Sequence, residues 1–308
     1  MSTWDHKLGI IVPSWNTVME YEMQRMAGGT MSLHTERIRH TADTEENLVW
    51  MSTQAPAAAE LLSHAKVDAI CYGCTGSGFL KTPAADQKLA ADLEARTGIP
   101  CLTTSAAVAD ALRALGAKRI SVASPYEPWL NEKLRIYLTA AGFDILALQG
   151  LGTQAHSTIS TERVKALAAE VTRPETEAIF ISCSNFRTLD IIESIEQSLG
   201  KPVVTSNQAS MWKSLRRIGD RRVIANAREE FLRIDDKNIP EPREVVPVIV
   251  STDFRGTHCL DCHQAQVGAA NGAASITLDL KGDYASLSKT SALLWGGQAA
   301  LHGGIRST

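Results

Sequence analysis

The sequence reads Asp68-Ala69-Ile70-Cys71-Tyr72-Gly73-Cys74-Thr75 in its first half and Glu177-Ala178-Ile179-Phe180-Ile181-Ser182-Cys183-Ser184 in its second. Both stretches are an acidic residue, a short apolar run and then a cysteine at the same place. The similarity continues downstream, where residues 98–105 match residues 200–207 and a helical pattern follows each, to Gly116 and to Gly219. We interpret this as a duplicated unit in which Cys74 and Cys183 are equivalent.

The alternation of strand and helix patterns predicts an α/β fold. Short apolar runs without polar alternation suit strands that are buried on both faces of a parallel sheet. The predicted strands are 8–12, 67–72, 119–123, 177–182 and 202–205, and the predicted helices are 44–65, 84–97, 106–115, 128–141, 161–171 and 188–199. We expect two pseudo-symmetric domains, 1–116 and 117–219, with parallel sheets flanked by helices. Residues 220–308 have no counterpart in the repeat, and we expect them to form an appended tail.

The composition is that of an ordinary globular protein. The chain has 308 residues, 44% hydrophobic and 21% charged, with a formal net charge of −3. We therefore expect neither a nucleic-acid partner nor a membrane, because no basic excess occurs and no run approaches the ~20 apolar residues of a membrane span. A cytoplasmic homo-oligomer is expected, and in that compartment the six cysteines are expected to be thiols.

The segment Cys74-Thr75-Gly76-Ser77-Gly78 follows a predicted strand and opens a helix. Free backbone N–H groups at such a junction favour anions, and they can lower a thiol pKa from its usual value of about 8.5. The alternative is a small buried hydrophobe, which describes most free cysteines. Cys183-Ser184-Asn185 repeats the arrangement, and Asn185 is either a carboxylate ligand or a turn residue.

Polar residues also follow the first strand of each half. Ser14 and Asn16 stand beside Thr17 after the first strand, where capping of the next helix explains one of them and substrate binding is open to the others. Tyr126 stands at the similar point of the second half. It offers a phenol to the predicted cleft, or it is an amphipathic tyrosine at a strand edge.

Two cysteine motifs have a spacing that is found in metal sites, and we predict a metal at neither. Cys71 and Cys74 spell C-x-x-C, but residues three apart on a strand point to opposite faces. His258-Cys259-Leu260-Asp261-Cys262-His263 has the spelling of a haem attachment site and four soft ligands, but it lacks a second ligand pair at a zinc spacing. Nucleotide-binding glycine motifs are also missing, so no cofactor is expected.

Combined, these motifs resemble those of the aspartate/glutamate racemase superfamily, and within it the branch of maleate cis-trans isomerases and arylmalonate decarboxylases. The resemblance covers residues 7–219 and is carried by residues 10–17, residues 73–77, Tyr126 with Asn131-Glu132, and Ser182-Cys183 with Thr188-Leu189-Asp190. It implies two racemase-type domains with the active site between them and no cofactor. It further implies that Cys74 is a nucleophile, that Cys183 is its acid/base partner, and that Asn16 and Tyr126 bind substrate carboxylates.

The resemblance also separates the candidate reactions. Decarboxylases of the branch carry a glycine at the place of Cys74, so decarboxylation is disfavoured. We expect isomerisation of a maleate-like dicarboxylate, with Thr75, Gly76, Ser77, Ser184 and Asn185 as further substrate contacts. A two-cysteine racemase and a non-catalytic carboxylate-binding protein stay open as alternatives. The isomerase loop expected from the resemblance is Cys-Thr-Ser-Gly-Ser, and Gly76-Ser77-Gly78 shifts the second hydroxyl by one place.

Overall fold

The computed structural model describes residues 4–222, 253–254 and 257–258. Residues 4–222 belong to one compact unit. In the second unit, residues 240–308, β9 (Asp253–Phe254) pairs antiparallel with β10 (Thr257–His258). Most of the predicted tail lies outside the described residues, and so does the whole C-x-x-C-H stretch, including Cys259, Cys262 and His263.

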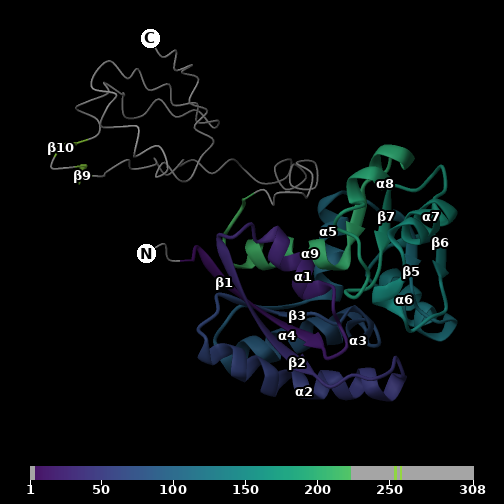
Figure 1. Ribbon diagram of the computed structural model, residues 1–308. Coiled ribbons are helices and arrows are strands. Elements are labelled where there is room, and N and C mark those ends of the chain that lie inside the picture. Colours follow the sequence, from purple (N-terminus) through teal and green to yellow (C-terminus); the bar gives the residue numbers. More distant parts are fainter. Residues whose placement is uncertain (1–3, 223–252, 255–256, 259–308) are drawn as a thin grey trace, which may run out of the picture. The chain divides into compact units, whose positions relative to one another are not determined.

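The first half forms a four-stranded parallel sheet in the order β2-β1-β3-β4. Its strands are β1 (His6–Pro13), β2 (Met31–Ile38), β3 (Ala69–Tyr72) and β4 (Cys101–Thr103). Its helices are α1 (Met19–Met26), α2 (Glu45–His64), α3 (Thr75–Gly78), α4 (Pro83–Thr97) and α5 (Thr104–Ala114). Figure 1 shows α2 and α4 on one face of this sheet and α1 on the other.

The second half repeats this topology, with a parallel sheet in the order β6-β5-β7-β8. Its strands are β5 (Arg119–Ser124), β6 (Asp144–Gly150), β7 (Ala178–Ile181) and β8 (Val203–Thr205). Its helices are α6 (Pro128–Ala140), the short 3-10 helix η1 (His156–Thr158), α7 (Thr161–Val171), α8 (Ile192–Leu199) and α9 (Ser206–Arg217). The predicted α/β fold with two pseudo-symmetric sheets is confirmed. The domain limits at 116 and 219 stay a prediction.

Equivalent residues end a helix and begin the next strand in the same way in both halves. Gly98 and Gly200 end α4 and α8 at positive φ angles of 69° and 63°, where a side chain is strained. The carboxylate four residues before each glycine accepts the backbone N–H that opens the next strand, from Cys101 to Glu94 (3.1 Å) and from Val203 to Glu196 (2.9 Å). The sequence repeat is therefore a repeat of caps and turns, and not only of apolar runs.

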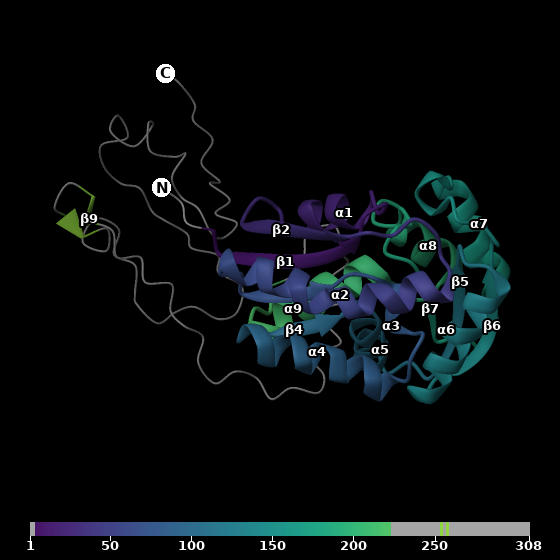
Figure 2. The same cartoon turned by 90° about the horizontal axis from the view of Figure 1, so that it is seen from below.

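Helices α5 and α9 join the two halves. They pack against each other, and α9 also contacts β3, β4 and α1, which belong to the first half (Figures 1 and 2). Thr104 and Ser210 meet across this contact, with 2.8 Å between their hydroxyl oxygens. The chain thus returns to its first sheet at the end of its second repeat, which fixes the two sheets relative to each other.

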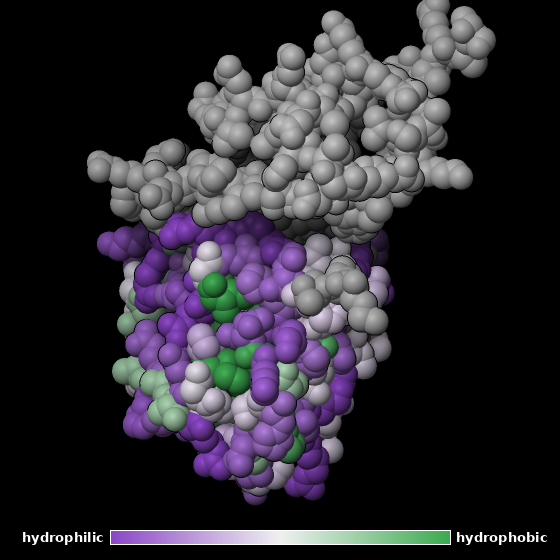
Figure 3. Space-filling model, turned by 90° about the vertical axis from the view of Figure 1, so that its left-hand side faces the viewer, coloured by the Kyte–Doolittle hydropathy of each residue, from purple (hydrophilic) through white to green (hydrophobic). Residues whose placement is uncertain are grey.

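The surface of the described part is mainly polar. The face in Figure 3 carries few hydrophobic residues, and they are separated by polar ones. The large exposed hydrophobic residues are Trp4, Tyr21, Val49, Trp50, Leu61, Ile136 and Leu146. No helix within the described ranges is long and apolar enough to cross a membrane. The expected homo-oligomer stays a prediction.

Candidate active site

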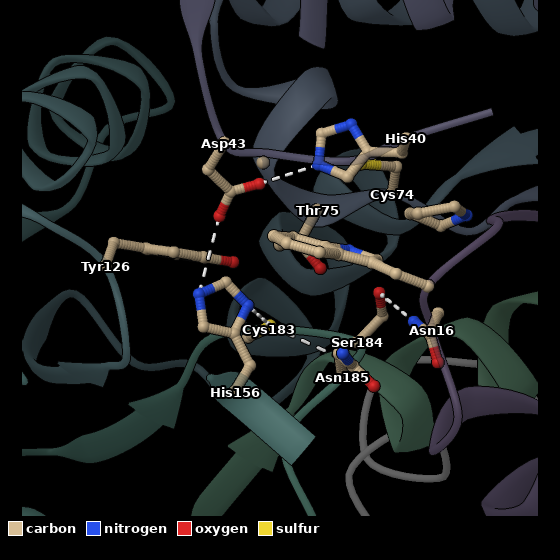
Figure 4. A pocket seen from close by; sticks show the side chains of 13 residues that line it. Asn16, His40, Asp43, Cys74, Thr75, Tyr126, His156, Cys183, Ser184 and Asn185 are labelled. Carbon is tan, nitrogen blue, oxygen red and sulfur yellow. Dashed lines mark hydrogen bonds and ion pairs between the residues drawn. The ribbon is translucent and has the colours of Figure 1, made fainter. Parts of the chain in front are cut away.

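The carboxyl ends of the strands in both halves surround one pocket of about 290 Å³, its open mouth included. Cys74 and Cys183 each lie two residues beyond the end of a central strand, β3 or β7, and both line this pocket (Figure 4). Parallel strands bring the residues that follow them to one edge of a sheet. The predicted site residues that line the pocket are Asn16, Cys74, Thr75, Gly76, Tyr126, Cys183, Ser184 and Asn185.

Two predicted substrate contacts, Ser14 and Ser77, are not among the lining residues. The Ser14 hydroxyl accepts the backbone N–H of His40 (2.9 Å) and donates to its carbonyl (3.2 Å). The Ser77 hydroxyl donates to the Leu48 carbonyl (2.7 Å) and accepts from the Tyr72 hydroxyl (2.9 Å). Both hydroxyls therefore hold loops around the pocket together.

The Cys74 thiol caps the short helix α3. Its sulfur accepts the backbone N–H of Ser77 at 3.4 Å. Burial nevertheless raises the pKa of this thiol to about 12, and the hydrogen bonds from the backbone N–H groups of Ser77 and Gly76 only partly oppose it. The sequence-based expectation of a lowered pKa is therefore wrong for this site, because the side chain is almost fully removed from water.

Cys183 has a backbone conformation that Cys74 does not share. Its φ is +121°, a region that side chains rarely adopt, whereas Cys74 has φ −114°. The loop is held by the backbone N–H of Cys183, which donates to the Ser206 hydroxyl at 3.0 Å. The Cys183 sulfur accepts the N–H of Asn185 at 3.3 Å. Burial raises the pKa of Cys183 well above its usual value and outweighs this bond.

Polar contacts lock the two cysteine loops to each other and to the β1–α1 loop. The Asn16 side-chain oxygen accepts the N–H groups of Val18 and Met19, where α1 begins, both at 3.0 Å. The Asn16 amide nitrogen donates to the Ser184 hydroxyl, also at 3.0 Å. The Thr75 hydroxyl donates to Ser206 at 3.1 Å. The same Ser206 oxygen therefore holds both cysteine loops.

Asn185 and Glu22 connect the loop after Cys183 to the first half of the chain. The Asn185 side-chain oxygen accepts the N–H of Thr17 at 3.0 Å. Glu22 is buried and accepts the N–H groups of Thr188 (2.6 Å) and Leu189 (2.8 Å) and an amide hydrogen of Asn207 (2.7 Å). Burial raises the pKa of Glu22, against these hydrogen bonds. The loop after Cys183 is thus held by residues of the first half.

Tyr126 presents its phenol to the pocket from the loop after β5. The ring is 3% exposed and packs edge to face on Phe79, and its hydroxyl accepts from Ser182 at 3.4 Å. Burial raises the pKa of Tyr126 well above its usual value. The phenol therefore stays protonated and can donate a hydrogen bond to an anion.

Five further residues line the pocket that the sequence did not single out as site residues: Pro13, Trp15, His40, Asp43 and His156. His40 and Asp43 follow β2, and His156 follows β6. Both are edge strands that the sequence analysis did not predict, so the loops after them were not expected at the pocket. Asp43 lies between the two histidines, 2.9 Å from Nε2 of His40 and 3.4 Å from Nε2 of His156 (Figure 4).

The charged groups of the pocket are few. Among the described residues that line it there is no Lys or Arg. In residues 4–222 no group of three or more His, Cys, Asp or Glu side chains is arranged to hold a metal ion. The expectation that no cofactor is needed stays a prediction. An anionic ligand would be held by amides, hydroxyls, backbone N–H groups and imidazoles.

The comparisons with known proteins agree on one family. The family model described as arylmalonate decarboxylase matches residues 8–230. Maleate isomerase from Nocardia farcinica is 30% identical over 68% of this chain and 89% of its own length. The crystal structure of the maleate isomerase Iso from Pseudomonas putida aligns with a TM-score of 0.68 at 25% identity, covering 72% of this chain and 96% of that chain.

A second solved structure is also similar in fold. It is a cysteine-to-serine mutant of the Nocardia farcinica maleate cis-trans isomerase, with a covalently bound succinylcysteine intermediate. Its TM-score is 0.70 at 24% identity, and the alignment covers 74% of this chain and 98% of that chain.

Proposed function

The chain belongs to the arylmalonate decarboxylase family of the aspartate/glutamate racemase superfamily, and from this premise we propose that it isomerises a small cis-unsaturated dicarboxylate of the maleate type. The observation that carries the proposal is the pair of thiols, Cys74 and Cys183, that line one buried pocket from equivalent positions. The Nocardia relative is a maleate isomerase, and its structure with a succinylcysteine intermediate supports a covalent route.

In the proposed reaction the Cys74 sulfur adds to the carbon–carbon double bond as a soft nucleophile. The charge that develops on the substrate spreads into the adjacent carboxylate as an enediolate. The backbone N–H of Thr75, which opens α3, has no acceptor within the helix and can donate to this charge. The former double bond is now single and rotates, and departure of the sulfur restores the double bond in the trans geometry.

The other lining residues have roles that follow from their chemistry. Tyr126 and the amide of Asn16 can donate to the substrate carboxylates, and Ser184 and Asn185 lie at the same wall of the pocket. Cys183 serves as the acid/base partner of Cys74, because it is the second ionisable sulfur in the pocket. Ser14 and Ser77 act through the loops that they hold.

The test follows maleate, arylmalonates and small amino acids by proton NMR in heavy water. We expect conversion of maleate to its trans isomer, with loss of turnover in Cys74→Ser. The matched control is Cys101→Ser, since Cys101 opens β4 at the opposite end of the sheet and its sulfur donates to the Ile99 carbonyl at 3.2 Å. This control is expected to retain activity.

Other outcomes of the same experiment decide against the proposal. Full turnover of maleate by Cys74→Ser would exclude covalent addition. Exchange of solvent deuterium into the α-carbon of an amino acid, without isomerisation, would assign the two thiols to racemisation. Binding of dicarboxylates that raises the melting temperature without any product would assign the pocket to a binding protein.

A further inference from the structure

His156 lies directly against the sulfur of Cys183. Its ring nitrogen Nδ1 is 3.5 Å from the Cys183 sulfur, and its other nitrogen, Nε2, is 2.9 Å from the Thr153 carbonyl oxygen and 3.4 Å from the Asp43 carboxylate. Asp43 in turn contacts His40 through its second oxygen at 2.9 Å. Figure 4 shows Asp43 between His40 and His156, with Cys183 beside His156.

The hydrogen-bond partners assign the proton of the neutral His156 ring. The Thr153 carbonyl can only accept, so Nε2 must carry the hydrogen and donate it. In the neutral ring Nδ1 is then left with its lone pair, which faces the Cys183 sulfur. His156 is therefore oriented to accept a proton from Cys183.

The surroundings hold the ring in this orientation. His156 is 3% exposed, and Trp15 packs edge to face on both histidines, with ring centroids 5.6 Å from His156 and 4.7 Å from His40. Burial lowers the pKa of His156, and the Asp43 carboxylate opposes this by favouring the charged ring. The ionisable groups that face His156 are Asp43, His40 and Cys183, together with Tyr126, whose ring centroid is 5.8 Å away.

We propose that His156 is a catalytic base that takes the proton of Cys183, and that Asp43, itself held by His40, is the positioning residue that stabilises the resulting imidazolium. The S–H bond of Cys183 breaks, its electron pair stays on sulfur, and an N–H bond forms at Nδ1. The product is a thiolate–imidazolium pair that faces a carboxylate.

Two buried thiols with raised pKa values provide no base inside the pocket. The Cys183 thiolate, formed by proton transfer to His156, provides one. In the isomerisation proposed above, on which this step rests, the Cys183 thiolate accepts the proton of Cys74 as that sulfur adds to the alkene. Cys183 ends as a thiol, and His156 keeps one proton as imidazolium. Its positive charge balances the negative charge gained by the substrate, and elimination reverses each transfer.

The test measures alkylation of Cys183 by iodoacetamide against pH, with the two cysteines resolved as separate peptides by mass spectrometry. In His156→Gln we expect the Cys183 rate near neutral pH to fall by about tenfold or more, because a loss of one pKa unit of assistance is a factor of ten in thiolate. Asp43→Asn has nearly the same shape as the wild-type side chain, and it should shift the profile in the same direction by less.

The controls separate this inference from the function proposed above. His34→Gln removes a histidine on β2 that contacts Ser32 and does not line the pocket, so its profile should equal that of the wild type. The readout needs no substrate, so a shifted profile stands even if maleate is not turned over. If His156→Gln and Asp43→Asn are both folded by circular dichroism and leave the Cys183 profile unchanged, His156 is not the base. If only the Asp43 variant folds, an unchanged Cys183 profile in that variant overturns the stabilisation of the imidazolium by Asp43, and the proposal with it.

Discussion

The backbone of Cys183 offers a measurement of strain at the site. Its φ of +121° is unfavourable for any residue with a Cβ atom and free for glycine. At each cysteine we compare the free energies of unfolding of the glycine and the alanine variant. We expect glycine to be more favourable relative to alanine at Cys183 than at Cys74, where φ is −114°. The two cysteines occupy equivalent positions of the repeat, so Cys74 is the matched control.

The magnitude follows from the two backbone conformations. At Cys74 alanine should be the more stable replacement by about 0.5–1 kcal/mol, because glycine loses more conformational entropy on folding. At Cys183 the strain of a Cβ atom, about 1–3 kcal/mol, opposes that preference and is expected to reverse it. The difference between the two sites isolates the strain, because the entropy terms largely cancel.

Urea denaturation of the four variants gives this difference from their free energies of unfolding. A value of about 1–3 kcal/mol in favour of glycine at residue 183 is expected. Equal alanine preferences at both sites would refute the strained conformation. They would also refute the inference that the Ser206 hydroxyl and the Asn185 N–H hold Cys183 in a conformation that its own preferences oppose.

Two further predictions concern buried groups behind the site. Asp86 is bonded by Thr103 (2.6 Å) and Tyr137 (3.0 Å), and burial raises its pKa from 3.8 to about 6. The folded state holds the Asp86 proton more tightly than the unfolded state does. The free energy of unfolding should therefore fall by about 3 kcal/mol in total as pH rises from about 3 to about 7, with about 2 kcal/mol of that between about pH 4 and about pH 6, and Asp86→Asn should remove this fall in pH-resolved denaturation. Gly73→Ala would place a Cβ 2.9 Å from the Ile11 carbonyl oxygen and 2.6 Å from the Met19 sulfur, so calorimetry should show a loss of about 1–3 kcal/mol, and an unchanged melting temperature would contradict the packing described here.

The repeat made much of the fold predictable. Five of the eight strands in residues 4–222 were predicted, and they include the two central strands of each sheet. The strands that were missed are β2 and β6 at the sheet edges and the three-residue β4. β2 has polar residues that are only partly buried, so it lacks the continuous apolar run of a central strand. β6 contains the short apolar run 145–148, which the sequence analysis did not identify as a strand, and its residues are partly buried or exposed.

The missed strands explain the missed site residues. His40 and Asp43 follow β2, and His156 follows β6, so their loops reach the pocket only because both strands are parallel to the central ones. The topology was the missing information, since the edge strands β2 and β6 run parallel to the central strands and so bring the loops that follow them to the same pocket. A histidine just after an unrecognised edge strand gives no local signal.

The thiol pKa values also needed the structure. The sequence identified donors near Cys74 and Cys183, and the donors are present. It could not weigh them against burial, which depends on helices and loops brought in from both halves. Burial outweighs these donors, so the pKa values of both thiols are raised. A base is then required to form a thiolate, and we propose His156 as that base.

The central claim is that the Cys74 sulfur forms a bond to the substrate, and peptide-resolved mass spectrometry of the Cys183→Ser variant tests it most directly. Addition is expected to be slower in this variant because the Cys183 base is missing, but elimination needs the same group in reverse and is slowed as well. The adduct is therefore expected to accumulate over a long incubation with maleate. We predict a mass gain of one substrate molecule that fragmentation of the peptide places on Cys74, and none on Cys71, three residues away on the same peptide, or on Cys101. Turnover of maleate by the wild type, with no adduct on Cys74 in quenched samples of either protein, would contradict the claim.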